Sequence, residues 1–373
     1  MLRSPLALAA LLAVAACNPF APTLAVADLA DRPDAFETRP GGLGAGDSVR
    51  YVVHVSIDGL RPDAVERLGA ELPGFVRLRT ESAHTHNART DPDYRLTLPN
   101  HTSQLTGRGV VGEDGHAWTV NYNPPRRATL HSNKGRYVAS VFDVVHDAGL
   151  RTAAYVSKPK FSLYERSYSA AGAPDTTGAD DGPDKIDLYL FNRDTEALVA
   201  AMRRHSGVFP AAYTFVHIRD PDGAGHVYSW SVRRGSRYLR AVRSASARVG
   251  EILDAVESNP QMRGRTAVIV TADHGGSGRH HARERPLHYT VPFYVWGAGI
   301  GRADLYALNP DRFADPGTEN VGYDAPRQPV RNGDAANLAL ALLGLGPVPG
   351  STITPGDPLV VRSAPPDTLA AGR

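Results

Sequence analysis

The chain has 373 residues, with 41 Lys and Arg against 39 Asp and Glu and a formal net charge of +2. Its 42% apolar and 21% charged residues exclude a disordered, collagen-like or coiled-coil chain. The near-neutral charge argues against a nucleic-acid polymer as partner, because such binders carry a strongly basic footprint. The single cysteine, Cys17, excludes an intrachain disulfide and a cysteine-based zinc cluster, so a metal site must use Asp and His.

The N-terminal segment has the pattern of a secretory signal. Arg3 precedes an apolar run over residues 6–15, and small residues lead to Cys17. The run is too short for a transmembrane helix, which needs about 20 residues. Val14-Ala15-Ala16-Cys17 is similar to a bacterial lipobox, so residues 1–17 are expected to be a lipoprotein signal segment in which Cys17 becomes lipidated. The lipid would anchor the protein outside the cytoplasm, on the periplasmic or outer-membrane face. Plain cleavage and release as a soluble periplasmic or secreted protein is the alternative.

Three further segments follow. Residues 18–47, rich in Ala, Pro, Gly and Asp, are predicted to form a flexible tether. Residues 48–362 form the predicted catalytic domain, and residues 363–373 form a tail.

From residue 48 onward, strand and helix signals alternate. Short apolar or β-branched runs predict strands over 51–57, 152–157, 212–218, 266–271 and 291–296. Helical spacing predicts helices over 242–256 and 335–343, the second with Asp334 as N-cap and a stop at Gly344. The pattern indicates an α/β fold with a mostly parallel central sheet covered by helices on both faces. Residues 159–187 break the alternation and predict a small inserted cap near the site.

Acidic and imidazole side chains gather where the predicted strands end. They are Asp58 after the first run, Asp222 and His226 after the third, Asp273 and His274 after the fourth, and His288 just before the fifth. A single strand-terminal Asp-Gly is usually a turn, and a single His there is usually a satisfied polar group. Functional groups of open α/β sheets lie beyond the carboxyl ends of the strands, so the set together predicts a site for two zinc ions. His280 and His281 are expected on a mobile loop.

The order and residues of these segments resemble the alkaline phosphatase superfamily, most closely its nucleotide pyrophosphatase/phosphodiesterase branch, over residues 50–350. The family's nucleophile is a Thr in a Thr-aromatic-Pro-Asn motif, which Thr97-Leu98-Pro99-Asn100 matches with Leu in place of the aromatic residue. Asn100 is expected to shape the nucleophile turn more than to bind substrate, whereas the resemblance implies that Asn121 binds a phosphoryl oxygen. The implied ligands are Asp222, His226 and His288 for one zinc and Asp58, Asp273, His274 and Thr97 for the other.

The chemistry of threonine agrees with this role. A threonine hydroxyl is a poor nucleophile at neutral pH unless a base or a metal activates it. A predicted short helix over 99–106, bounded by Gly107, would direct its positive dipole end at Thr97. The resemblance implies attack of Thr97 on phosphorus, a phospho-threonine intermediate and its release by water. The alternative is that Thr97 merely caps the helix.

Charge bears on the substrate. Two zinc ions and three carboxylates give the site a net charge of about +1, and a threonine alkoxide would make it neutral. A nearly neutral site suits a singly charged diester. Lys158 and Lys160 are similar to the Lys-x-Arg pair of some phosphomonoesterases, or are solvated loop residues. The prediction is therefore a phosphodiesterase or nucleotide pyrophosphatase acting on a small phosphate ester or nucleotide, with a phosphomonoesterase as the alternative. A phosphoethanolamine-type transferase, which normally carries transmembrane helices, and an inactive binding protein are less favoured.

Overall fold

The computed structural model describes residues 49–168, 177–178 and 184–362. The predicted signal segment with Cys17, the tether and the tail lie outside the described residues. So does part of the predicted cap, at 169–176 and 179–183.

The described residues form one eight-stranded sheet in the order β4-β3-β5-β1-β6-β7-β2-β8. The strands are β1 Tyr51–Ile57, β2 Ala83–Arg89, β3 Thr152–Val156, β4 Leu188–Phe191, β5 Tyr213–Ile218, β6 Thr266–Thr271, β7 Thr290–Gly297 and β8 Ala303–Asp304. Neighbouring strands in the part β4-β3-β5-β1-β6 of this order are parallel, whereas β7 is antiparallel to both β6 and β2. β2 therefore runs in the same direction as β6. The predicted mostly parallel α/β fold is confirmed.

β1 lies at the centre of the sheet because its sequence suits burial on both faces. All seven residues of YVVHVSI are buried, and Val53 pairs with Thr214 of β5 and with Val268 of β6. A strand rich in Val and Ile is typical of a parallel sheet covered by helices on both faces.

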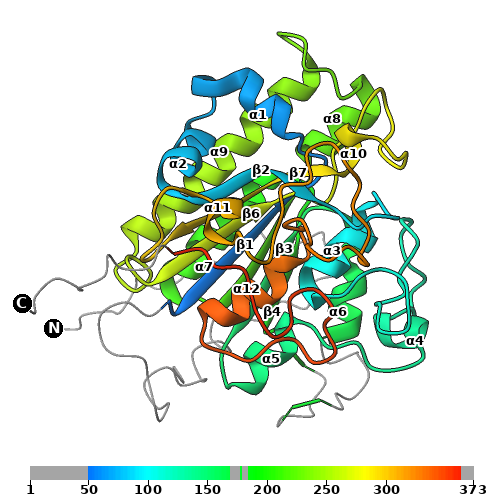
Figure 1. Cartoon of the computed structure of the whole chain (residues 1–373). Coiled ribbons are helices and arrows are strands. Elements are labelled where there is room, and N and C mark those ends of the chain that lie inside the picture. Colours follow the sequence, from blue (N-terminus) through cyan, green and yellow to red (C-terminus); the bar gives the residue numbers. More distant parts are fainter. Residues whose placement is uncertain (1–48, 169–176, 179–183, 363–373) are drawn as a thin grey trace, which may run out of the picture.

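Helices cover both faces of the sheet (Figure 1). On one face α1 Pro62–Leu68, α2 Pro73–Glu81, α7 Thr195–Val208 and α8 Asp220–Tyr228 contact the long helix α9 Arg237–Ser258. On the other, α3 Thr97–Thr106 and α5 Val141–Asp147 contact α12 Asp334–Leu342, while α6 Ser162–Tyr168 contacts α4 Leu130–Lys134. Shorter helical turns are η2 Gly69–Glu71, η3 Pro159–Phe161, α10 Pro286–Tyr289 and α11 Leu305–Leu308.

The helices α9 and α12 begin earlier than predicted, as α3 also does. α9 starts at Arg237 because the Ser236 side chain accepts from the Leu239 amide and caps a turn in which Tyr238 and Leu239 extend the buried stripe. α12 starts at Asp334, with Gly333 rather than Asp334 as its N-cap. Among the helices of the described residues, none is both long and apolar enough to cross a bilayer.

Candidate active site

The predicted site residues converge at one edge of the sheet. β1, β3, β5 and β6 point their carboxyl ends toward the side where α3, α8 and α10 lie (Figure 1). β2 runs in the same direction, so the chain that leaves it reaches the start of α3 at this edge. The antiparallel β7 has its amino end here, which brings the loop between β6 and β7 to the same place.

Two groups of buried side chains at this edge could each hold a metal ion. One is Asp58, Asp273 and His274, and the other is Asp222, His274 and His281, with the ligand atoms of each group within 4.8 Å of one another. His274 belongs to both groups. Its Nε2 lies 3.2 Å from Asp273 Oδ2, 3.6 Å from Asp58 Oδ1 and 4.0 Å from Asp222 Oδ1.

The donor atoms of these groups suit a cation. Asp58 Oδ1, Asp222 Oδ1 and Asp273 Oδ2 are buried and accept no hydrogen bond from the described residues. Buried carboxylate oxygens without a partner are costly unless a cation binds them. His274 Nδ1 donates to the Gly275 carbonyl at 2.8 Å, which leaves Nε2 unprotonated and free to coordinate.

The Asp222 group contains His281 and not the predicted His288. His281 is buried, its ring stacks on that of His274 with centroids 3.7 Å apart, and its Nδ1 donates to the Arg95 carbonyl at 2.5 Å. His288 Nε2 instead lies 2.7 Å from Ser277 Oγ, and His288 belongs to neither group. The expectation of a mobile loop at His281 is not met, because the loop between β6 and β7 packs this side chain against His274.

His226 lies at the opening of the site. Its Nε2 is 3.2 Å from Asp222 Oδ1, and its Nδ1 donates to the Arg279 carbonyl at 3.2 Å. Its side chain is 46% exposed, in contrast to the buried His274. The structure therefore brings His226 to Asp222, as the sequence predicts, one helical turn along α8.

Thr97 is the first residue of α3, two residues before the predicted start of that helix. Leu96 is the N-cap, so Thr97 does not have the capping role of the alternative. Thr97 Oγ1 lies 3.5 Å from His274 Nε2 and 3.5 Å from Asn121 Nδ2. Asn121 Oδ1 accepts from the Leu98 amide at 3.0 Å, which orients the Asn121 amide group across the first turn of α3.

Asn100 has a different environment from Asn121. Its Oδ1 accepts from the Asp91 amide at 2.9 Å, and its Nδ2 donates to the carbonyls of Tyr94 at 2.5 Å and Leu96 at 3.2 Å. These bonds hold the loop that leads into α3 and Thr97.

Lys158 and Lys160 both point into the site. Lys158 Nζ lies 2.5 Å from Asp58 Oδ2 and 2.5 Å from Asp222 Oδ2, and its side chain is 11% exposed. Lys160 Nζ donates to Asn121 through the backbone oxygen at 2.6 Å and Oδ1 at 3.1 Å. The alternative of solvated loop lysines is wrong.

Two further histidines, His217 and His101, bond groups of the site. His217 accepts from the Ser157 amide at Nδ1, 3.4 Å away, so its Nε2 is protonated and donates to Asp58 Oδ2 at 3.0 Å. His101 Nδ1 donates to the Thr97 carbonyl, and its Nε2 lies 2.8 Å from Ser56 Oγ. His217 lies inside β5 and His101 inside α3, where a sequence pattern does not distinguish them from ordinary buried histidines.

The three carboxylates differ in their electrostatics. Burial raises the pKa of Asp58, but the Lys158 ammonium and His217 outweigh it and hold that pKa well below its ordinary value. The pKa of Asp222 is lowered as well, because Lys158 and His226 outweigh burial and the charge of Asp58. Burial and the Asp58 charge raise the pKa of Asp273 well above its ordinary value. Burial lowers the pKa of Lys158, but the three carboxylates more than offset this and keep it cationic.

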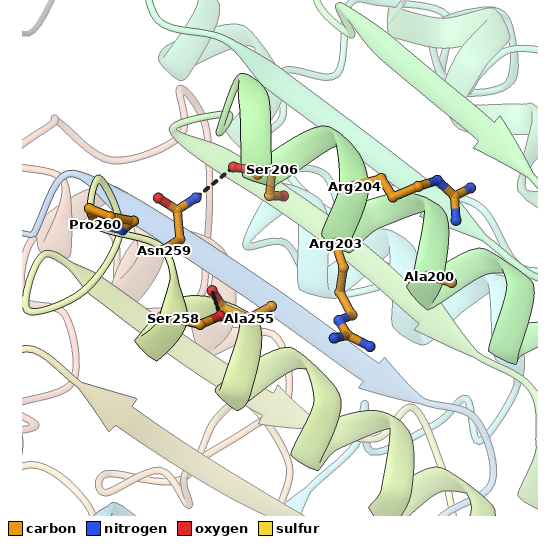
Figure 2. A pocket seen from close by; sticks show the side chains of 9 residues that line it. Ala200, Arg203, Arg204, Ser206, Ala255, Ser258, Asn259 and Pro260 are labelled. Carbon is orange, nitrogen blue, oxygen red and sulfur yellow. Dashed lines mark hydrogen bonds between the residues drawn. The ribbon is translucent and has the colours of Figure 1, made fainter. Parts of the chain in front are cut away.

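A separate hollow of about 530 Å³ lies at the other edge of the sheet. It lies between the C-terminal ends of α7 and α9, which lead into the amino ends of β5 and β6 (Figure 2). Its charged lining residues are Arg203 and Arg204, and Asn259 Nδ2 donates to the Ser206 carbonyl at 2.7 Å. With no acid, imidazole or metal-ligand group in its lining, it does not offer the chemistry of the Asp58 edge.

Comparison with known proteins gives a family for this geometry. The family model of type I phosphodiesterase / nucleotide pyrophosphatase matches residues 52–290. GPI ethanolamine phosphate transferase 1 of Neurospora crassa is 29% identical over 169 residues, 43% of this chain and 16% of that protein. The same transferase of Mus musculus is 30% identical over 145 residues, 37% of this chain and 15% of that protein. The aligned part thus spans less than a fifth of these relatives' length.

Solved structures share the fold. Murine ectonucleotide pyrophosphatase/phosphodiesterase 5, in an inactive form in complex with AMP, has a TM-score of 0.52 at 14% identity, covering 83% of this chain and 97% of that one. A 2-O GAG sulfatase has a TM-score of 0.52 at 14% identity, covering 80% and 71%. At this identity the likeness establishes the alkaline-phosphatase-like fold.

Proposed function

The chain belongs to the type I phosphodiesterase / nucleotide pyrophosphatase family, and from this premise we propose that it is a zinc-dependent phosphoric ester hydrolase with Thr97 as nucleophile. The observation that carries the proposal is the cluster of three buried, unpartnered carboxylate oxygens around His274 Nε2, which itself lies 3.5 Å from Thr97 Oγ1. Mixed oxygen and imidazole donors suit zinc.

Asp58, Asp273 and His274 would hold one ion, and Asp222, His226 and His281 the other. Two such ions, when bound, favour the alkoxide form of a threonine and offset charge on phosphoryl oxygens. This site is proposed for a small phosphate ester or nucleotide.

The protein's own groups then position the reaction. Thr97 attacks phosphorus, forming a bond from its Oγ1 while the leaving alcohol departs, and water later cleaves the phospho-threonine bond. Asn121 presents Nδ2 beside Thr97 Oγ1, where it can donate to a phosphoryl oxygen. The N-terminal end of the ten-residue helix α3 adds a favourable dipole for the negative charge that develops there.

We favour a diester over a monoester as substrate. The family match supports the diester, because the family is that of phosphodiesterases and nucleotide pyrophosphatases. A phosphomonoesterase is the second candidate, because Lys158 and Lys160 point into the site and a cation there would favour a dianionic monoester. The similarity to ethanolamine phosphate transferases makes transfer to an alcohol instead of water a third reaction to test.

The direct test compares three substrates on the purified, zinc-loaded protein. Bis-p-nitrophenyl phosphate and p-nitrophenyl thymidine monophosphate should be hydrolysed with a higher kcat/KM than p-nitrophenyl phosphate. A reversed preference would identify a monoesterase. Adding an acceptor alcohol and separating the products distinguishes transfer from hydrolysis, and a product that is mainly the transferred ester would contradict the hydrolase assignment.

Thr97→Ala tests the covalent mechanism. The variant should keep its fold and metal content but lose about 10³-fold or more in kcat, because the metals and Asn121 still supply part of the catalysis. Thr97→Ser should retain some rate, since it keeps the hydroxyl. Near-wild-type turnover in Thr97→Ala would show that another group is the nucleophile.

A further inference from the structure

Lys158 has an unusual position for a site lysine. Its ammonium bonds one oxygen of Asp58 and one of Asp222, each at 2.5 Å, and these two carboxylates belong to different metal-binding groups. Asp58, Asp222 and Asp273 are all buried. Among the described residues, Lys158 is the one Lys or Arg that forms an ion pair with any of them. The ammonium therefore lies where the negative charges of the two groups meet.

We propose that Lys158 is a built-in counter-ion of the metal site, which keeps the metal-free protein folded and moderates its affinity for metal ions. The inference rests on the proposed function, because Asp58 and Asp222, which pair with Lys158, are also the proposed metal ligands. It gives Lys158 a role distinct from gripping the phosphoryl group of a substrate.

The oxygen atoms used by Lys158 differ from those that face the metal groups. Lys158 bonds the Oδ2 atoms of Asp58 and Asp222, whereas their Oδ1 atoms are the ones without a hydrogen-bond partner, 3.6 and 4.0 Å from His274 Nε2. His217 also donates to Asp58 Oδ2, which fixes the rotation of that carboxylate. The lysine can thus remain in place when ions bind to the inner oxygens.

Charge balance gives this arrangement two consequences. Without metal, the two buried carboxylates of Asp58 and Asp222 share one ammonium, and removing one partner of a buried ion pair is strongly destabilising. When metal ions bind, the ammonium repels them strongly, because water screens charges poorly in a buried site. With two divalent ions bound, the site including Lys158 would carry about +2, which a Thr97 alkoxide and a singly charged diester bring to neutrality. A lysine here is therefore compatible with a diester substrate.

The experiment measures thermal unfolding of the full chain, stripped of metal by a chelator and then titrated with zinc chloride at pH 8. Lys158→Met keeps most of the side-chain volume and removes the charge. We expect its metal-free Tm to fall by roughly 5–10 °C, its zinc affinity to rise at least about tenfold, and its zinc-induced rise in Tm to exceed that of the wild type. An unchanged metal-free Tm, or a smaller zinc-induced rise, would overturn the proposal.

A second variant covers the case in which Lys158→Met does not fold without metal. Lys158→Met combined with Asp222→Asn removes one positive and one negative charge together and should recover much of the lost metal-free stability. A double variant no more stable than Lys158→Met would contradict the counter-ion role.

Lys160→Met is the matched control. Lys160 lies two residues away and bonds Asn121 but no carboxylate, so its loss should leave the zinc-induced rise in Tm as in the wild type. None of these measurements uses a substrate. A protein that binds zinc as expected but hydrolyses no phosphate ester would refute the proposed function and leave the counter-ion inference standing.

Discussion

His281 and His288 show how the surroundings of one residue determine its chemistry. Both lie between β6 and β7, His281 on the loop and His288 in the helical turn α10. Burial lowers the pKa of His281 to about 2, so its imidazole is neutral over the physiological range, as a metal ligand must be. Burial also lowers the pKa of His288, to about 4, but its ring nitrogen faces Ser277 rather than a carboxylate.

The two histidines should therefore respond differently to replacement. His281→Ala is expected to weaken binding of one of two zinc ions by about 100-fold or more and to abolish most activity, because an inner ligand is lost. His288→Ala should retain both ions. Metal content after gel filtration, measured by mass spectrometry, checks this, and loss of an ion from His288→Ala alone would restore the original ligand prediction.

The strand-end residues could be predicted because position in a parallel sheet dictates proximity. Asp58, Asp222 and Asp273 each follow a strand whose direction the alternating pattern implies, so their convergence follows from topology. Lys158 also follows a strand, but its side chain is long and flexible, so the sequence does not predict which groups its ammonium contacts. The choice between His281 and His288 depends on how the loop folds back, which no periodic pattern records.

At the scale of elements, helix α3 contains both Thr97, the proposed nucleophile, and Asn100, which holds the turn before it. Asn100 bonds the loop backbone through three partners, whereas the partly buried Asn121 reaches Thr97 Oγ1. Asn100→Ala should lower the free energy of unfolding by about 1–3 kcal/mol, because buried backbone groups lose their partners. Asn121→Ala should mainly lower kcat. Urea unfolding and steady-state kinetics separate the two, and an Asn100→Ala protein of normal stability but raised KM would support a substrate-binding role instead.

Helix α12 makes stability depend on pH. Burial raises the pKa of Asp334 to about 6, although the Arg331 amide and the Thr354 hydroxyl donate to its carboxylate. Because the folded state holds this proton more tightly than the unfolded state, the contribution of Asp334 to stability is complete below about pH 4 and is lost as the pH rises through 6. Asp334→Asn should remove this component, about 3 kcal/mol at most. Unfolding free energies of both proteins at pH 4, 5, 6 and 7 check it, and parallel curves would contradict it.

The strands that the sequence predicts differ in composition from those it misses. The predicted run 51–57 coincides with β1, and 266–271 coincides with β6, because both are rich in β-branched residues and lie in the middle of the sheet. β2, with the sequence AHTHNAR, has no such run, and its pairing with β7 is interrupted by an irregularity between Thr85 and Ala88. Its place in the sheet comes from long-range pairing with β7, which local propensity does not encode.

At the scale of the whole molecule, the topology explains how one antiparallel strand completes the site. If β7 ran parallel to β6, its amino end would lie at the far edge of the sheet, and the loop that carries His281 would have to cross the sheet by a long connection. The reversal lets a loop return directly to the edge where Thr97 and Asp58 lie. The hollow between α7 and α9 (Figure 2) lies at the opposite edge, where the amino ends of β5 and β6 begin.

The N-terminal segment bears on where the whole protein is located. Cys17 lies outside the described residues, and the lipobox-like Val14-Ala15-Ala16-Cys17 is the basis for proposing an extracytoplasmic, lipid-anchored enzyme. Two acyl chains or more are needed for stable anchoring, which a lipidated N-terminal cysteine provides and a cleaved soluble chain does not. Cys17→Ser should therefore move the protein from the membrane fraction to the soluble extracytoplasmic fraction, or block its processing, while the purified domain keeps its activity. Cell fractionation followed by an immunoblot checks this, and Asn18→Gln is the matched control that retains the cysteine. If the Cys17→Ser protein were processed normally and stayed in the membrane fraction, Cys17 would not be the anchor.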